Sequence, residues 1–274
     1  MFNSALVILF VATFGCNNCD PVNILQCGRA GNSQGLIVGG SAIQQNRWPW
    51  LASLYYLPDQ SHFCGGSIVS ENHIITAAHC IHPKGVQTPK STDDVIAWLG
   101  KHNLSQQFER GSEAFYPTTI RVHPDWSHSS ERYDGDIATL FSELAIRFTL
   151  KISSICLWGF TNINDETEGT VVGWGLSEKT GFKYVEDTPK EVKVMRSSLS
   201  QCYEDDYRFA KISSPRMFCA HGVLKDSGPC NGDSGKLKWS WWIWHIFISY
   251  YRRWILCYAR WYLVSTWNSF SVFS

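Results

Sequence analysis

The chain has 274 residues, and its 24 basic and 24 acidic residues leave it formally uncharged. This length allows one large domain or two small ones, each with a sizeable buried core, and the neutral balance gives no sign of a nucleic-acid partner. Ten cysteines are widely spaced, without two paired Cys-x-x-Cys motifs, so disulfides formed in an oxidising compartment are a better interpretation than a metal site.

The chain begins with an apolar run over residues 5–12. This run is too short to span a bilayer and has the length of the central region of a signal peptide. We therefore expect residues 1–15 to be a signal peptide that is removed near Gly15, and the protein to be secreted without stable membrane insertion. A buried strand or an N-terminal anchor is the alternative interpretation.

Residues 16–36 are rich in Cys, Asn and Gly and have no apolar periodicity, so they are interpreted as an irregular connector, the remnant of a propeptide or light segment. The next residues, Ile37-Val38-Gly39-Gly40, fit a strand that ends in a turn. From Leu51 to Ala145, short apolar runs alternate with turn residues. This pattern predicts many short strands in an all-β barrel or sandwich.

Three short motifs carry residues suited to nucleophilic catalysis. They are Thr76-Ala77-Ala78-His79-Cys80, Asp134-Gly135-Asp136-Ile137-Ala138 and Cys230-Asn231-Gly232-Asp233-Ser234-Gly235. A serine hydroxyl is a weak nucleophile at neutral pH, so it needs an imidazole to take its proton and a carboxylate to orient that imidazole. Ser234 is the candidate nucleophile, His79 the candidate base and Asp136 the candidate orienting carboxylate.

The glycines around Ser234 suit a second requirement of this chemistry. A tight turn can aim the backbone N–H groups of Gly232 and Ser234 at one point, where the oxyanion of a substrate would develop. Each motif also has a plainer interpretation. Gly-Asp-Ser-Gly and Asp136 both suit ordinary turns, and His79 is one of nine histidines.

The three motifs, in the order His, Asp, Ser, resemble those of the chymotrypsin-like serine proteases. The resemblance implies an all-β fold of two six-stranded antiparallel β-barrels with a short C-terminal helix. It implies a serine endopeptidase that acts on protein substrates and needs no cofactor or metal. It covers residues 37–235, which would form the protease domain.

The resemblance also implies synthesis as a zymogen. Cleavage between Leu36 and Ile37 would free an amino terminus that pairs with Asp233. Most relatives carry Arg or Lys before the cut, whereas Leu36 resembles the modular serine proteases of arthropod immune cascades. Expected partners are then a downstream protease zymogen as substrate and inhibitors such as serpins.

The floor of the primary specificity pocket in this family corresponds to Gly228, followed by Pro229. Without a carboxylate at that position a buried basic side chain would be unpaired, so we expect cleavage after apolar residues. Asp226 lies two residues away, and a shifted loop would restore a basic preference.

Three disulfides are implied by the resemblance: Cys64 with Cys80, Cys27 with Cys156, and Cys202 with Cys219. Cys230 is left without an assigned partner. Asn103-Leu104-Ser105 is an acceptor sequence for N-glycosylation, expected in a polar loop of a secreted protein.

After Gly235 the chain departs from the family. Residues 236–274 contain seven Trp, four Tyr, three Phe and five Lys or Arg, with no Asp, Glu, Gly or Pro. This stretch has no strand-and-turn pattern and no amphipathic period, so the sequence does not support the late strands and the helix that the family fold requires. A change of reading frame just after Gly235 would explain this composition. A basic aromatic tail for membrane surfaces is the alternative. If the pocket wall is lost, the protein would be an inactive protease homologue with a binding or regulatory role.

Overall fold

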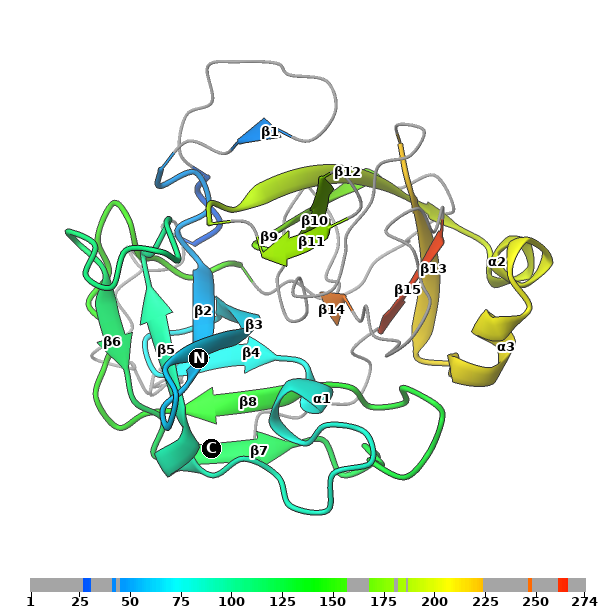
Figure 1. Cartoon of the computed structure of the whole chain (residues 1–274), viewed down its shortest axis with the longest axis horizontal. Coiled ribbons are helices and arrows are strands. Elements are labelled where there is room, and N and C mark those ends of the chain that lie inside the picture. Colours follow the sequence, from blue (N-terminus) through cyan, green and yellow to red (C-terminus); the bar gives the residue numbers. More distant parts are fainter. Residues whose placement is uncertain are drawn as a thin grey trace, which may run out of the picture.

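The computed structural model describes residues 27–30, 41–42, 45–156, 168–179, 182–185, 187–223, 246–247 and 261–265. Within these ranges the chain is mainly antiparallel β-structure arranged in two large sheets with a few short helices (Figure 1). The predicted signal peptide, the Leu36–Ile37 junction and the segment that contains Ser234 lie outside the described residues.

The first sheet has seven strands in the order β6-β5-β2-β3-β4-β8-β7. Their bounds are Glu113–Phe115, Val95–Leu99, Leu51–Tyr56, Ser61–Ile68, His73–Thr76, Ala138–Phe141 and Thr119–Val122. The pairing of β2 with β3 shifts between Leu54 and Tyr55. Such a bulge increases the local twist, which fits the curled sheet seen in Figure 1.

The core of this half is one large apolar cluster. Trp50, Leu54, Ile74 and Leu140 are fully buried in one apolar cluster. Trp174, which comes from the second half of the sequence, belongs to the same cluster. The apolar runs that alternate with turns therefore act as the sequence pattern predicts, since they supply the core side chains.

The second sheet follows the order β1-β12-β13-β15-β14, and β9 pairs with β12. Its strands are Ser41–Ala42, Lys190–Ser197, Met217–Gly222, Trp261–Ser265, Ile246–Phe247 and Glu168–Gly173. A separate hairpin is formed by β10 (Leu176–Lys179) and β11 (Phe182–Val185).

The helices in the described part of the chain are short. They are α1 (Ala78–Ile81), α2 (Leu199–Asp205), α3 (Arg208–Ile212) and the 3-10 turn η1 (Thr92–Asp94). The hydroxyl of Ser198 accepts a hydrogen bond from the Gln201 backbone N–H and so caps α2. No helix among the described residues is long and apolar enough to cross a membrane.

The all-β prediction is confirmed. The sheets have seven and six strands, where six each were expected. The expected C-terminal helix lies outside the described residues.

Residues 236–274, where the sequence shows no strand-and-turn pattern, nevertheless contain β14 and β15. β15 pairs with β13 over five residues, with Cys219 opposite Leu263, and β14 pairs with β15. Strand pairing is made by backbone N–H and C=O groups, which every residue except proline supplies. A sequence without the usual alternation can therefore still add a strand to an exposed sheet edge.

Candidate active site

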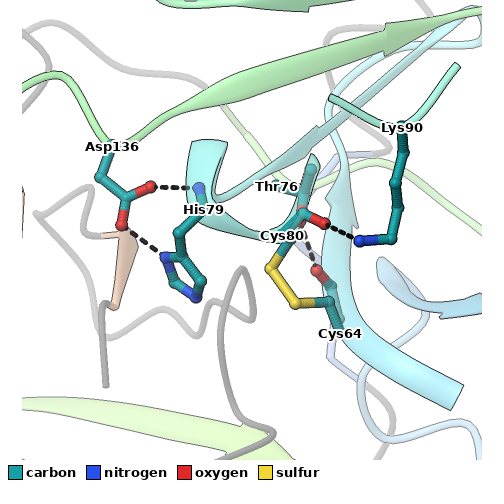
Figure 2. The surroundings of a disulfide bond; sticks show 7 residues. Cys64, Thr76, His79, Cys80, Lys90 and Asp136 are labelled. Carbon is teal, nitrogen blue, oxygen red and sulfur yellow. Dashed lines mark hydrogen bonds and ion pairs between the residues drawn. A yellow bond between two sulfur atoms is a disulfide. The ribbon is translucent and has the colours of Figure 1, made fainter. Parts of the chain in front are cut away.

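His79 and Asp136 meet between the one-turn helix α1 and the start of β8. The Nδ1 of His79 lies 2.6 Å from one carboxylate oxygen of Asp136, and the backbone N–H of His79 donates to the other at 2.7 Å. Figure 2 shows both contacts. Because two donors of one residue face two oxygens of the same carboxylate, the imidazole is fixed in both position and orientation.

Local chain geometry brings the two residues together. β4 ends at Thr76, and the extended Ala77 turns the chain into α1 directly before His79. Gly135 has a φ of +62°, and a Cβ there would lie 2.8 Å from the Nδ1 of His123. Glycine at this position lets the chain turn tightly between Asp134 and Asp136 and enter β8.

The pair is shielded from solvent. Asp136 is fully buried and His79 is 7% exposed. A buried carboxylate is stable only when its oxygens are paired, and both oxygens of Asp136 are. Nδ1 of His79 faces a carboxylate oxygen, which can only accept a hydrogen bond from it, so the imidazole carries a proton on Nδ1. This is the tautomer that a general base needs.

A disulfide supports α1 from the other side. Cys80, the residue after His79, is bonded to Cys64 of β3. Lys90 donates to the backbone carbonyl of Cys80 at 3.1 Å, and Thr76 donates to the carbonyl of Gly65 at 2.7 Å (Figure 2). The helix is thus attached to the first sheet at both ends, although it has only four residues.

Cys64, His79 and Cys80 are also residues of the kinds that bind metal ions. The candidate ligand atoms of Cys64, His79 and Cys80 lie within 4.8 Å of one another. Both sulfur atoms are in a disulfide, however, and zinc binds the thiolate form of cysteine. This cluster therefore does not fit a metal ion in the oxidised protein.

Two aromatic rings flank His79. The centroid of Tyr133 lies 6.0 Å from that of His79 in an edge-on arrangement, and the centroid of Trp126 lies 6.4 Å away. Both side chains are buried. Neither residue belongs to one of the three catalytic motifs. Only their place shortly before Asp136 marks them, and no local pattern shows that their rings pack against a histidine from another loop.

Asp134 occupies a different environment from Asp136. Its carboxylate forms a bidentate pair with Arg216, at 2.8 and 2.7 Å, and the third nitrogen of the guanidinium lies 2.6 Å from Asp125. The hydrogen bond from Arg216 lowers the pKa of Asp134, while burial opposes the shift. The same contacts raise the pKa of Arg216. This cluster links the loop that carries Asp136 to the second half of the chain.

We expect Arg216→Met to reduce stability in a pH-dependent way. Because the pKa of Asp134 is lower in the folded state, its contribution is present above the unfolded value of about 3.9 and is lost as the pH falls through the folded value. The free energy of unfolding at pH 7 should fall by roughly 1 kcal/mol, since the pair is partly solvated. The difference from wild type should vanish toward pH 2.

Urea denaturation at a series of pH values measures this effect. Arg208→Met is the matched control, because Arg208 pairs with Asp206, only two residues away in the chain. An equal loss in both variants would contradict the assignment of Arg216 as a link between the two halves.

Asn103 lies in a loop built around the buried carboxylate of Glu109. That carboxylate accepts the backbone N–H groups of His102 and Asn103 at 2.7 and 2.9 Å. Burial opposes ionisation of Glu109, but these hydrogen bonds and one from Gln45 outweigh it and lower its pKa. The side-chain oxygen of Asn103 accepts from both the N–H and the hydroxyl of Ser105. Glycosylation of Asn103 remains a prediction.

The remaining predicted site residues fall into two groups. The structure contains the disulfides Cys27–Cys156, Cys64–Cys80 and Cys202–Cys219, the same pairs that the resemblance implies. Leu36, Ile37, Gly228, Pro229, Gly232, Asp233 and Ser234 lie outside the described residues. The structure therefore brings together His79 and Asp136, and the part played by Ser234 stays a prediction.

Comparisons with known proteins point in one direction. A family model described as trypsin matches residues 37–236. The chain is 32% identical over 197 residues to Serine protease gd of Drosophila melanogaster, in a match that covers 65% of this chain and 37% of that protein. It is 30% identical over 234 residues to Chymotrypsin-C of Rattus norvegicus, covering 84% of this chain and 80% of that protein. The chain thus spans well under half the length of the first relative.

Solved structures give the same fold. Mouse neuropsin, described as a serine protease expressed in the limbic system of the brain, superposes with a TM-score of 0.67 at 22% identity, covering 84% of this chain and 94% of that one. Human heparin binding protein gives a TM-score of 0.64 at 21% identity, covering 84% and 91%. At these identities the likeness is one of fold.

Proposed function

Because this chain belongs to the trypsin family of serine proteases, we propose that it is a secreted serine endopeptidase, made as a zymogen and activated by cleavage between Leu36 and Ile37. The observation that carries the proposal is the contact of His79 with Asp136, in which the carboxylate holds the imidazole through Nδ1 and the backbone N–H.

The proposed reaction follows the mechanism known for this family. The hydroxyl of Ser234 attacks the scissile carbonyl while Nε2 of His79 takes its proton. The backbone amides of Gly232 and Ser234 hold the oxyanion, and His79 then protonates the leaving amine. Water releases the acyl group by the same steps. Asp136 stays ionised throughout and stabilises the imidazolium that forms.

Activation would depend on a charge pair made after cleavage. The new ammonium of Ile37 would pair with Asp233, directly before the nucleophile. A buried ion pair is stable only with both partners present, so the loop of Gly232 to Ser234 would lack its organiser in the uncleaved chain. We infer that the zymogen has little activity.

The proposed substrates are proteins cleaved after apolar residues. Gly228 and Pro229 at the pocket floor offer no carboxylate for a basic side chain. Leu36, at the proposed activation junction, suits such a pocket, so one molecule could activate another.

The arthropod origin of Serine protease gd supports a role in an arthropod cascade, with another protease zymogen as substrate and serpins as inhibitors. The three disulfides support an oxidising, extracellular location.

An active-site serine probe tests this proposal. Residues 32–36 are replaced by an enteropeptidase recognition sequence, so that the protein can be cut directly before Ile37. We expect a fluorophosphonate to label the cut protein, to label the uncut protein far more slowly, and to leave Ser234→Ala unlabelled.

The same experiment decides the alternative function. If cut protein with all three disulfides intact is not labelled, the enzyme assignment fails. The chain is then an inactive homologue with a binding or regulatory role, as the unusual composition of residues 236–274 would suggest.

A further inference from the structure

His79 and Asp136 are carried by two different loops that must be held together. One loop follows α1 and runs from His82 to Lys90, and the other precedes Asp136 and includes Trp126 and Tyr133. The N–H of Gly85 donates to the carbonyl of His128 at 2.9 Å, and the indole N–H of Trp126 donates to the carbonyl of His82 at 3.0 Å. These bonds bring the loops edge to edge beside the candidate active site.

Lys84 makes the most concentrated contact between them. Its ammonium group donates to three backbone carbonyls of the second loop, those of Ser127, Ser130 and Arg132, at 2.7, 2.8 and 2.6 Å. An ammonium group has three N–H donors, so all of them are used. One side chain of the first loop thus fixes three points of a six-residue stretch of the second.

The same ammonium lies against the rings that flank His79. It is 3.9 Å from the ring centroid of Trp126 and 4.8 Å from that of Tyr133. The two rings lie 5.7 Å apart, and both are within 6.4 Å of the His79 ring. Lys84, the two rings and His79 therefore form a continuous layer of contacts from the loop to the base.

We propose that Lys84 is a positioning residue: its ammonium group fixes residues 127–132, and through Trp126 and Tyr133 it holds the substrate-facing surroundings of His79. The functional part of this inference rests on the proposed role of His79 as the base. A cation is required because three carbonyl oxygens and the faces of two aromatic rings, all partially negative, surround the Lys84 ammonium group. A neutral amine has only two N–H donors and would leave one carbonyl unpaired.

The charge state of Lys84 gives this contact a measurable signature. Burial lowers the pKa of Lys84 to about 8, and the negative charge of Asp136 opposes the shift. Tyr133 faces the ammonium group with its ring, and the charged residues Glu131 and Arg132 belong to the stretch that Lys84 contacts. The three hydrogen bonds from Lys84 are therefore intact at pH 7 and weaken as the pH rises through 8.

The test compares three full-length variants with wild type. Lys84→Met keeps the apolar stem and removes the donors. Lys84→Arg keeps the charge, but its planar guanidinium group cannot donate three N–H bonds from a single nitrogen to three carbonyl oxygens. Lys90→Met is the matched control, since Lys90 lies in the same loop and donates instead to Cys80. Hydrogen exchange is measured by mass spectrometry on peptides that cover residues 126–134.

We expect Lys84→Met to raise exchange at Ser130, Arg132 and Tyr133 at least about tenfold, with a smaller rise in Lys84→Arg and none in Lys90→Met. Unchanged exchange in Lys84→Met, or an equal rise in Lys90→Met, would overturn the inference. This measurement needs no catalytic activity, so it decides the positioning role even if wild type reacts with no serine probe and the proposed function fails.

Peptide hydrolysis by the cut protein tests the consequence for the site. Lys84→Met should raise KM about five- to tenfold with a much smaller change in kcat, since the groups that react are untouched. Wild-type KM should rise from pH 7 to pH 9, whereas Lys84→Met should have a high KM at both. Titration of the Ile37 terminus is common to both proteins, so equal pH profiles would show that Lys84 has no part in substrate positioning.

Discussion

Replacing Asp136 with asparagine is expected to lower kcat of the activated protein by about 10⁴, the loss known for the equivalent change in this family. Both oxygens of Asp136 accept hydrogen bonds from His79, one from Nδ1 and one from the backbone N–H. Asparagine has a single acceptor oxygen. If that oxygen stays with the backbone N–H, the amide N–H faces Nδ1 and moves the imidazole proton to Nε2, where it blocks proton transfer from Ser234.

Steady-state hydrolysis of a peptide substrate by the cut protein measures this loss, with kcat and KM determined separately. Asp134→Asn is the matched control, because Asp134 lies two residues away, is also ionised, and contacts Arg216 instead of His79. We expect this control to lose some stability and to keep kcat within about tenfold of wild type. Comparable losses of kcat in the two variants would contradict the assignment of Asp136.

Replacing Trp174 with alanine is expected to reduce the free energy of unfolding by about 3–5 kcal/mol. The side chain is fully buried in the apolar core of the first sheet, although Trp174 follows β9 of the second. Its indole N–H also donates to the carbonyl of His102 at 2.8 Å. The substitution leaves a large cavity where the two halves meet and an unpaired backbone carbonyl.

Urea denaturation followed by circular dichroism measures this change. Trp174→Phe separates the two contributions, since it keeps much of the apolar volume and loses the N–H donor. We expect it to lose about 1–2 kcal/mol, mostly from the unpaired carbonyl of His102 and the smaller ring. A loss below about 1 kcal/mol for Trp174→Ala would show that Trp174 does not stabilise the apolar core of the first sheet.

The β-structure and the dyad could be predicted because their signals are local. Alternation of short apolar runs with turn residues marks the strands of the first sheet, and the motifs around His79 and Asp136 are each five residues long. The difference in role between Asp134 and Asp136 cannot be derived from their motif, which contains both. In the structure the turn at Gly135 separates the two carboxylates, so that Asp134 faces Arg216 and Asp136 faces His79.

The strands β14 and β15 show why the rest could not be predicted. Their sequence lacks the side-chain alternation that marks a half-buried strand. The pairing of β15 with β13, and of β14 with β15, is made by backbone groups that every residue except proline has. Trp126, Tyr133 and Lys84 are a similar case. Each is an ordinary loop residue by its neighbours, and its role comes from contacts with another loop.

The sequence by itself determined the local chemistry of this protein: the serine, histidine and aspartate motifs, the strand pattern and the set of cysteines. Tertiary structure alone decided the partners, since His79 meets Asp136 across 57 positions and Arg216 meets Asp134 across 82. Residue type and spacing specify what a side chain can do and how the nearby backbone turns. Which distant group it meets depends on how the two sheets curl and pack, and no short stretch of sequence contains that information.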